Sequence, residues 1–134
     1  MRHFLSGPCA EAATLESLRV MAGQLGCELP DDYVAFMLET NGYAGCVGKM
    51  GFVNIWCAEQ AFPTNRANNF KEWIPGLVLF GANEGSEFYA FDMRRNPPGV
   101  VMVPMIPLDL ASAVDVGASF TDFMEGLARG RDLA

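Results

Sequence analysis

The stretch that most constrains the fold runs from Leu77 to Asp92 and reads LVLFGANEGSEFYAFD. Its first part, residues 77–80, is continuously apolar and too short for a helix, which favours a strand buried on both faces. Residues 83–86, Asn-Glu-Gly-Ser, supply turn residues that tolerate positive φ. Aromatic side chains then fall on both faces of the return segment, residues 87–92. We therefore predict an antiparallel hairpin at the centre of the core.

Two helices are predicted before this hairpin and one near the end of the chain. The first covers residues 14–26, with Thr14 as the N-cap of a segment whose apolar residues recur at helical spacing. The second covers residues 29–42, because proline and two carboxylates suit its first turn and Asn-Gly suits its end. The third covers residues 119–130 and begins with a Ser-x-x-Asp capping pattern.

The order of the elements defines the fold class. Strands are predicted at residues 51–56 and 100–103, and the second extends the hairpin as an antiparallel meander. Helices, sheet and a closing helix in this order are typical of an α+β protein. A chain of 134 residues with 51% hydrophobic content can form one core. We predict a single domain over residues 1–134, with 1–13 as a loose lead-in, 131–134 as a tail, and the helices packed against a mostly antiparallel sheet.

The segment between the second helix and the hairpin has a weaker pattern. Its glycine-rich start, residues 42–51, is expected to form a loop or a weak edge strand. A helical turn at residues 57–62 is expected to end at Pro63 and the asparagine-rich run that follows it. For Trp56 and Trp73, we favour core packing over a role as exposed binding anchors.

The cysteines and the histidine give little support for a metal or redox site. Cys9, Cys27, Cys46 and Cys57 have no CxxC spacing, and His3 is the only imidazole in the sequence. Zinc ligands usually come in close pairs, so we predict no metal site and no cofactor. Free thiols that pack as small hydrophobic groups are the expected form of the cysteines.

The charge and the apolar runs argue against two classes of partner. Nine basic and 16 acidic residues give a net charge of −7, which disfavours binding to nucleic-acid phosphates. Residues 1–25 lack the pattern of a signal peptide, and no apolar run approaches the ~20 residues that a membrane span needs. We therefore expect a cytoplasmic protein, in a reducing compartment, that binds neither nucleic acid nor membrane. The acidity either favours a positively charged partner or serves solubility alone.

Several short motifs follow one another along the chain. They are Leu29-Pro30-Asp31-Asp32-Tyr33, Asn41-Gly42, Trp56, Leu77 to Gly85 with Phe80-Gly81, Tyr89 to Asp92, and Ala118-Ser119-Phe120 with Phe123. This ordered set, over residues 14–130, resembles the SUKH superfamily, which includes bacterial toxin-immunity proteins and yeast regulators of cell-wall synthesis. The resemblance implies one α+β domain that acts by binding, without catalysis. In the bacterial members the partner is a cognate toxin, often a nuclease.

The first functional hypothesis is therefore an immunity-type protein that binds and neutralises a cognate bacterial toxin with a basic nuclease domain. Acidic side chains on one surface would mimic phosphate and accelerate association with a basic cleft. The candidate partner-binding residues are Glu84, Glu87, Asp109 and Asp115 as acidic contacts and Tyr89 as an aromatic anchor.

Two alternatives remain at this point. One is a non-enzymatic regulatory or scaffold module that binds a host protein. The other is a small hydrolase in which Glu84, Glu87 and Asp92, grouped around the hairpin, supply an acid and a base. Glu84 lies in a turn and Glu87 begins an alternating strand, and both are normal positions for carboxylates that face solvent. Catalysis by a cysteine nucleophile would need a base, and His3 is the only imidazole in the sequence. The residues thus favour a binding protein over an enzyme, and they leave its oligomeric state open.

Overall fold

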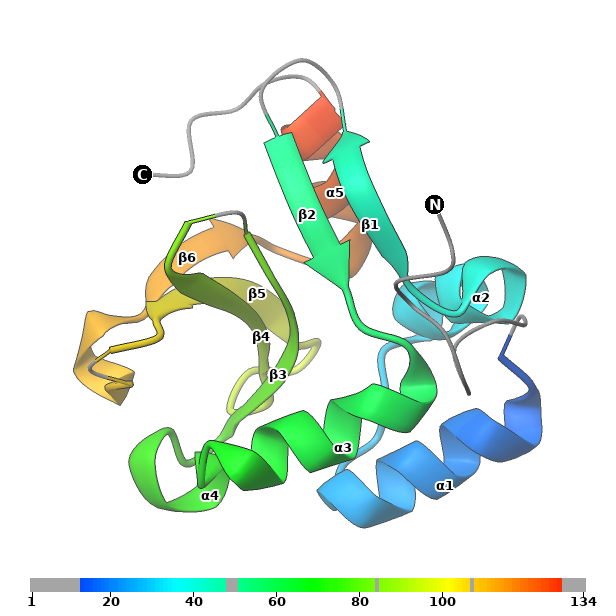
Figure 1. Ribbon diagram of the computed structural model, residues 1–134, viewed down its shortest axis with the longest axis horizontal. Helices are drawn as coiled ribbons and strands as arrows, with labels where there is room; N and C mark the ends of the chain where they lie inside the picture. The colour runs from blue at the N-terminus through cyan, green and yellow to red at the C-terminus, as the bar shows by residue number, and fades with distance from the viewer. Residues whose placement is uncertain (1–12, 48–50, 84, 107, 129–134) are drawn as a thin grey trace.

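The computed structural model describes residues 13–47, 51–83, 85–106 and 108–128. It shows an α+β fold around a six-stranded antiparallel sheet in the order β1-β2-β3-β4-β5-β6, which confirms the predicted fold class (Figure 1). The strands are β1 (Tyr43–Val47), β2 (Gly51–Ile55), β3 (Leu77–Ala82), β4 (Glu87–Asp92), β5 (Gly99–Pro104) and β6 (Val114–Gly117). The helices are α1 (Leu15–Leu25), α2 (Asp31–Thr40), α3 (Ala58–Ala67), α4 (Phe70–Trp73), the 3-10 helix η3 (Leu110–Ser112) and α5 (Phe120–Ala128).

The hairpin of β3 and β4 lies at the centre of the sheet, as predicted. All six residues of β3 are buried, and so are the last five of β4. The pairing register shifts between Leu79 and Gly81, so that Phe80 occupies a bulge. Gly81 cannot be replaced there without a shift of the backbone, because a Cβ atom would lie 2.6 Å from the backbone oxygen of Asn54 on β2. The close approach of β2 and β3 therefore explains why residue 81 is a glycine.

An aromatic cluster joins the hairpin to two helices. The rings of Phe80 and Phe91 stack with their centroids 4.3 Å apart. Phe120 of α5 and Tyr33 of α2 meet these rings edge-on or tilted, with the Tyr33 and Phe91 centroids 5.0 Å apart. The Phe123 ring of α5 completes the cluster from the next turn of that helix. Since edge-to-face and offset pairs add to the free energy gained by burial, this cluster fixes α2 and α5 on one face of the sheet.

The predicted helix caps are present. Thr14 and Ser17 form a capping box at the start of α1, and Gly26 ends this helix with a left-handed backbone. Asn41 ends α2 in the same left-handed conformation. At the start of α5, the Ser119 hydroxyl accepts a hydrogen bond from the backbone N–H of Asp122 at 3.0 Å. The ends of α1 and α2 and the start of α5 are therefore where the sequence predicts them, whereas the predicted end of the last helix at Gly130 lies outside the described residues.

Helix α3 differs from the prediction. It continues through Pro63 to Ala67, although the sequence indicates an end at the proline. Pro63 has no N–H to donate to the carbonyl of Glu59 one turn earlier, and both residues are exposed, where water can replace such a bond. The opposite side of the helix is held by Asn65, which is fully buried. Tertiary contacts of that side chain therefore override the local signal to stop.

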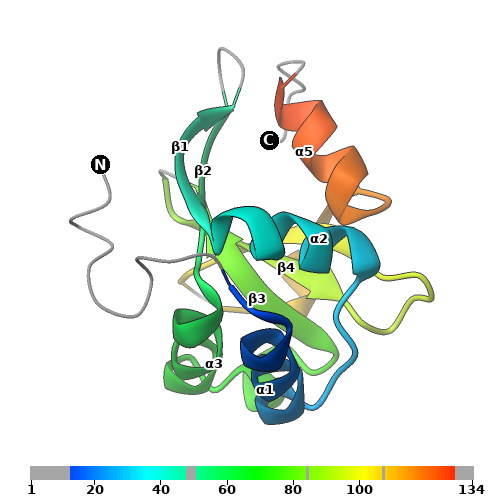
Figure 2. The same cartoon turned by 90° about the vertical axis from the view of Figure 1, so that its right-hand side faces the viewer.

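Two pairs of elements give the molecule its outline (Figures 1 and 2). Helices α1 and α3 lie side by side next to β3, while the β1–β2 hairpin extends away from them alongside α5. β2 pairs with β3 only through Asn54 with Ala82 and Ile55 with Gly81, after which the chain turns into α3. The rest of the β3 edge is therefore open to contact from α3.

The two tryptophans, for which core packing was expected, differ in their exposure. Trp56 is buried against Phe88, with the two ring centroids 5.7 Å apart, as expected for core packing. Trp73 is 54% exposed, so the expected core packing of Trp73 is wrong.

The described cysteines differ from one another in their bonding. Cys27 is a free thiol, as predicted. Cys57 is disulfide-bonded, which contradicts the prediction of free thiols. Disulfides are rare in reducing compartments, so this bond gives no support to the expected reducing environment.

Candidate partner-binding surface

The hairpin end that carries the predicted acidic contacts is ordered by side chains of its own. Glu84 lies outside the described residues. Glu87 is half-buried, and its carboxylate accepts a hydrogen bond of 2.7 Å from the side-chain amide of Asn83. The Asn83 side-chain oxygen accepts in turn from the backbone N–H of Glu87 at 3.1 Å. Glu87 therefore closes the turn, and only part of its carboxylate faces solvent.

Tyr89 lies in the core. Its side chain is 2% exposed, and its ring centroid is 4.6 Å from that of Phe123 on α5. Burial, and next the charge of Glu87, raise the pKa of its hydroxyl above the usual value. A ring in this position presents almost no surface to another protein, so the structure corrects the choice of Tyr89 as an exposed anchor. The alternation of β4 placed it correctly on a strand but could not show that α5 covers that face.

Asp109 and Asp115 are exposed and have different surroundings. Asp109 caps η3 by accepting from the backbone N–H of Ala111 at 3.1 Å. The Asp115 carboxylate on β6 forms an ion pair with Arg95, with its Oδ1 2.7 Å from Nη2. Glu87 and Asp109 belong to the end of the sheet where β4 begins and β5 ends, whereas Asp115 is paired with the turn at the opposite end. The structure therefore does not bring the three described carboxylates into one cluster.

The turn between β4 and β5 is organised around Asp92. This residue is 5% exposed, and its Oδ1 and Oδ2 accept from Nε and Nη2 of Arg94 at 2.8 and 3.0 Å. Nε of Arg95 lies 3.3 Å from Oδ2 and extends the network to Asp115. The hydrogen bond from Arg94, against the effect of burial, holds the pKa of Asp92 below its usual value. Both carboxylate oxygens of Asp92 are thus paired with arginine side chains, which leaves this residue poorly placed to act on a substrate as the hydrolase hypothesis requires.

A groove lies at the same end of the sheet, between this turn and the connection from α1 to α2. Its volume is about 780 Å³, and one wall carries the carboxylates of Glu28, Asp31 and Asp32. Asp32 is used internally, because its Oδ2 accepts from the backbone N–H and the hydroxyl of Thr121 at 2.8 and 2.9 Å. Glu28 and Asp31 are exposed. The sequence identified Asp31 and Asp32 as a capping pair but did not show that they border a groove.

No group of three or more His, Cys, Asp or Glu side chains in the described part of the chain is placed to hold a metal ion. None of the described helices combines the length and the apolar character that a bilayer crossing needs.

The sequence is similar to a known protein family. A search of curated proteins finds no match to the chain. The family described as SMI1 / KNR4 (SUKH-1) matches residues 12–126, which is most of the sequence. The matched region includes α1 to α4, the whole sheet and most of α5. The chain therefore belongs to the SMI1/KNR4 (SUKH-1) family.

Proposed function

We propose that the protein is an immunity-type protein that binds and neutralises a cognate bacterial toxin, and that the toxin carries a basic nuclease domain. The family membership supports an immunity-type or related regulatory protein that acts by binding. The net charge of −7 supports a basic partner. The family match is the observation that carries the proposal, and the charge specifies the kind of partner.

The charge suggests how such a complex would form. A negative field steers a basic domain toward the protein and accelerates association at low ionic strength. Carboxylates in the interface would then occupy the positions that nucleic-acid phosphates take in the active cleft of a nuclease. Because salt screens both effects, the affinity should fall as the ionic strength rises.

Two acidic surfaces are candidates for the contact. One is the hairpin surface, defined by Glu84 and Glu87. Asp109 at η3 and Asp115 on β6 lie apart from this surface and are proposed as separate further contacts. The other is the groove wall, defined by Glu28 and Asp31. The sequence analysis favours the hairpin surface. Glu28 and Asp31 on the groove wall are both exposed, so the groove wall is the alternative contact surface against which the hairpin surface is tested.

Paired charge reversals distinguish these surfaces. The variants Glu84→Lys/Glu87→Lys and Glu28→Lys/Asp31→Lys change the net charge by the same amount, so long-range steering is matched and a difference between them reports local contact. We expect the hairpin variant to weaken toxin binding at least tenfold more than the groove variant. The opposite ranking would move the interface to the groove, and equal small losses would exclude both surfaces.

The regulatory or scaffold function is the alternative outcome of the same measurements. It predicts no binding to the toxin domain encoded by a neighbouring gene and a host partner whose capture tolerates moderate salt. A non-enzymatic protein is expected in both cases. Turnover of a hydrolase substrate that is lost in Glu87→Gln would contradict this part of the proposal.

A further inference from the structure

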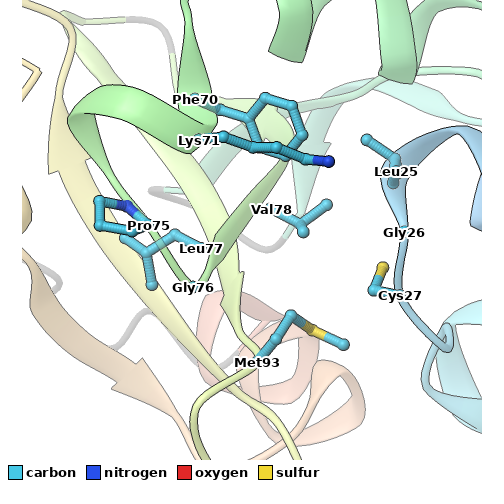
Figure 3. A pocket seen from close by; sticks show the side chains of 10 residues that line it. All are labelled: Leu25, Gly26, Cys27, Phe70, Lys71, Pro75, Gly76, Leu77, Val78 and Met93. Carbon is cyan, nitrogen blue, oxygen red and sulfur yellow. The ribbon is translucent and has the colours of Figure 1, made fainter.

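An apolar pocket lies where the end of α1, helix α4 and the start of β3 meet (Figure 3). Its volume is about 280 Å³, slightly below the roughly 300–1,000 Å³ that is typical of small-molecule sites, so it has room only for a short ligand. It is distant in the fold from the proposed toxin contacts on the hairpin. The apolar side chains that line it include Leu25, Phe70, Leu77, Val78 and Met93.

A single cationic side chain crosses this pocket. Lys71 extends from α4 toward Leu25 on α1, above Val78 and Met93 (Figure 3). Its Nζ atom is 5.8 Å from the centroid of the Phe70 ring. A Cβ atom placed on Gly26 would lie 3.8 Å from the same Nζ atom, so the amine reaches the end of α1. The described part of the chain gives Lys71 no ion pair.

The position of Lys71 has a purely structural explanation that must be separated from a binding role. Helix α1 has no basic residue in its last turn, and a cation near its C-terminus would interact favourably with the helix dipole. This interaction accounts for an amine close to Gly26. It does not account for the apolar hollow that the Lys71 stem borders.

We propose that this pocket binds a small apolar carboxylate, with its hydrocarbon chain in the hollow and its carboxylate at Nζ of Lys71. The apolar walls favour a hydrocarbon, the modest volume favours a short chain, and the single ammonium group favours a single negative charge. Burial raises the pKa of the Cys27 thiol in the same wall, so that this thiol stays neutral and does not compete for the ammonium group. The inference is independent of the proposed function.

The first test is a series of ligands of increasing length. Butanoate, hexanoate and octanoate are titrated by calorimetry against the intact protein, with hexanol as the uncharged analogue. Each added methylene group should tighten binding about fourfold until the pocket is full. Hexanol should bind about threefold more weakly than hexanoate, because it lacks the ion pair with the exposed amine of Lys71.

The location of the ligand is measured at Cys27. Bound hexanoate should slow alkylation of this thiol by iodoacetamide at least fivefold, as followed by mass spectrometry of the peptide that contains it. Resolution by peptide separates Cys27 from the other cysteines. Calorimetric binding without protection of Cys27 would place the acid elsewhere and overturn the proposal.

Two variants separate a ligand contact from a structural role. Lys71→Met keeps the apolar stem and removes the charge, and Arg66→Met removes an exposed cation from α3 outside the pocket. Because Lys71 is exposed, its ion pair with the ligand contributes modestly, and we expect about threefold weaker hexanoate binding in Lys71→Met and no change in Arg66→Met. A lower melting temperature of Lys71→Met with unchanged hexanoate affinity would assign Lys71 to the α1 dipole alone. Absence of binding by every acid in the series would also overturn the proposal.

Discussion

At the scale of single residues, Asn65 takes the place of a neighbouring strand. Its side-chain oxygen accepts from the backbone N–H of Leu79 at 2.8 Å, and its amide donates to the Leu79 carbonyl at 2.9 Å. The same amide also donates to the Ala61 carbonyl within α3 at 2.8 Å. One carboxamide thus satisfies both backbone groups of a buried residue on β3, beyond the point where β2 leaves the sheet.

Replacing Asn65 tests this edge contact. Asn65→Ala should lower the free energy of unfolding by about 2–4 kcal/mol, because two buried backbone groups lose their partners. Asn68→Ala is the matched control, since among the described residues the Asn68 amide donates to the Thr64 carbonyl of the same helix alone, and its loss should cost at most about 1 kcal/mol. Both values are measured by urea unfolding. Equal losses in the two variants would show that Asn65 has no special role at the sheet edge.

Asp92 makes stability depend on pH. Its pKa in the folded protein is lowered, chiefly by the hydrogen bond from Arg94, so the folded state favours the ionised form. This contribution is complete above the unfolded pKa of about 3.9 and is lost as the pH falls through the folded pKa. The difference in unfolding free energy between the wild type and Asp92→Asn should therefore shrink from pH 6 to pH 2. A constant difference over this range would contradict the assignment.

At the scale of elements, Asp32 connects two helices that are distant in sequence. It lies in the first turn of α2, and its carboxylate accepts from the backbone N–H of Thr121 in the first turn of α5. The carboxylate therefore satisfies a free N–H group at the start of α5. It fixes the two helices that carry the aromatic cluster to each other.

The neighbouring aspartate provides a control for this connection. Asp32→Ala should lower the free energy of unfolding by about 0.5–2 kcal/mol, the usual cost of losing a helix N-cap. Asp31→Ala removes an exposed carboxylate from the same turn and should change it by no more than about 0.5 kcal/mol. Thermal and urea unfolding of both variants measure the difference. If Asp31→Ala were the more harmful substitution, the link between α2 and α5 would be wrong.

Elements with local signals could be predicted from the sequence. The β3–β4 hairpin follows from a short apolar run and a turn, and α1 follows from Thr14 and Gly26, because each signal acts between residues close in the chain. The continuation of α3 depends on Asn65 contacting Leu79, a contact that spans 14 residues and has no local pattern. Local rules therefore interpret Pro63 as an end, whereas the folded structure does not.

At the scale of the whole molecule, the candidate site was less predictable than the fold. Acidic side chains in turns and strands can be identified from the sequence, but their partners cannot. Arg95 pairs with Asp115 across 20 residues, and α5 covers Tyr89 from the far end of the chain. The groove beside Asp31 arises from two connections that only the fold brings together. Which carboxylates remain free for a partner is thus a property of the tertiary structure.

The proposed neutralisation of a basic toxin domain by this acidic protein is tested most directly by calorimetry. The protein is titrated with the C-terminal domain encoded by the neighbouring gene, expressed as an inactivated variant, at low and at high salt. We predict tight binding that weakens as salt increases, because the net charge of −7 contributes to the attraction. Absence of binding at both salt concentrations would contradict the immunity function and favour a regulatory or scaffold module.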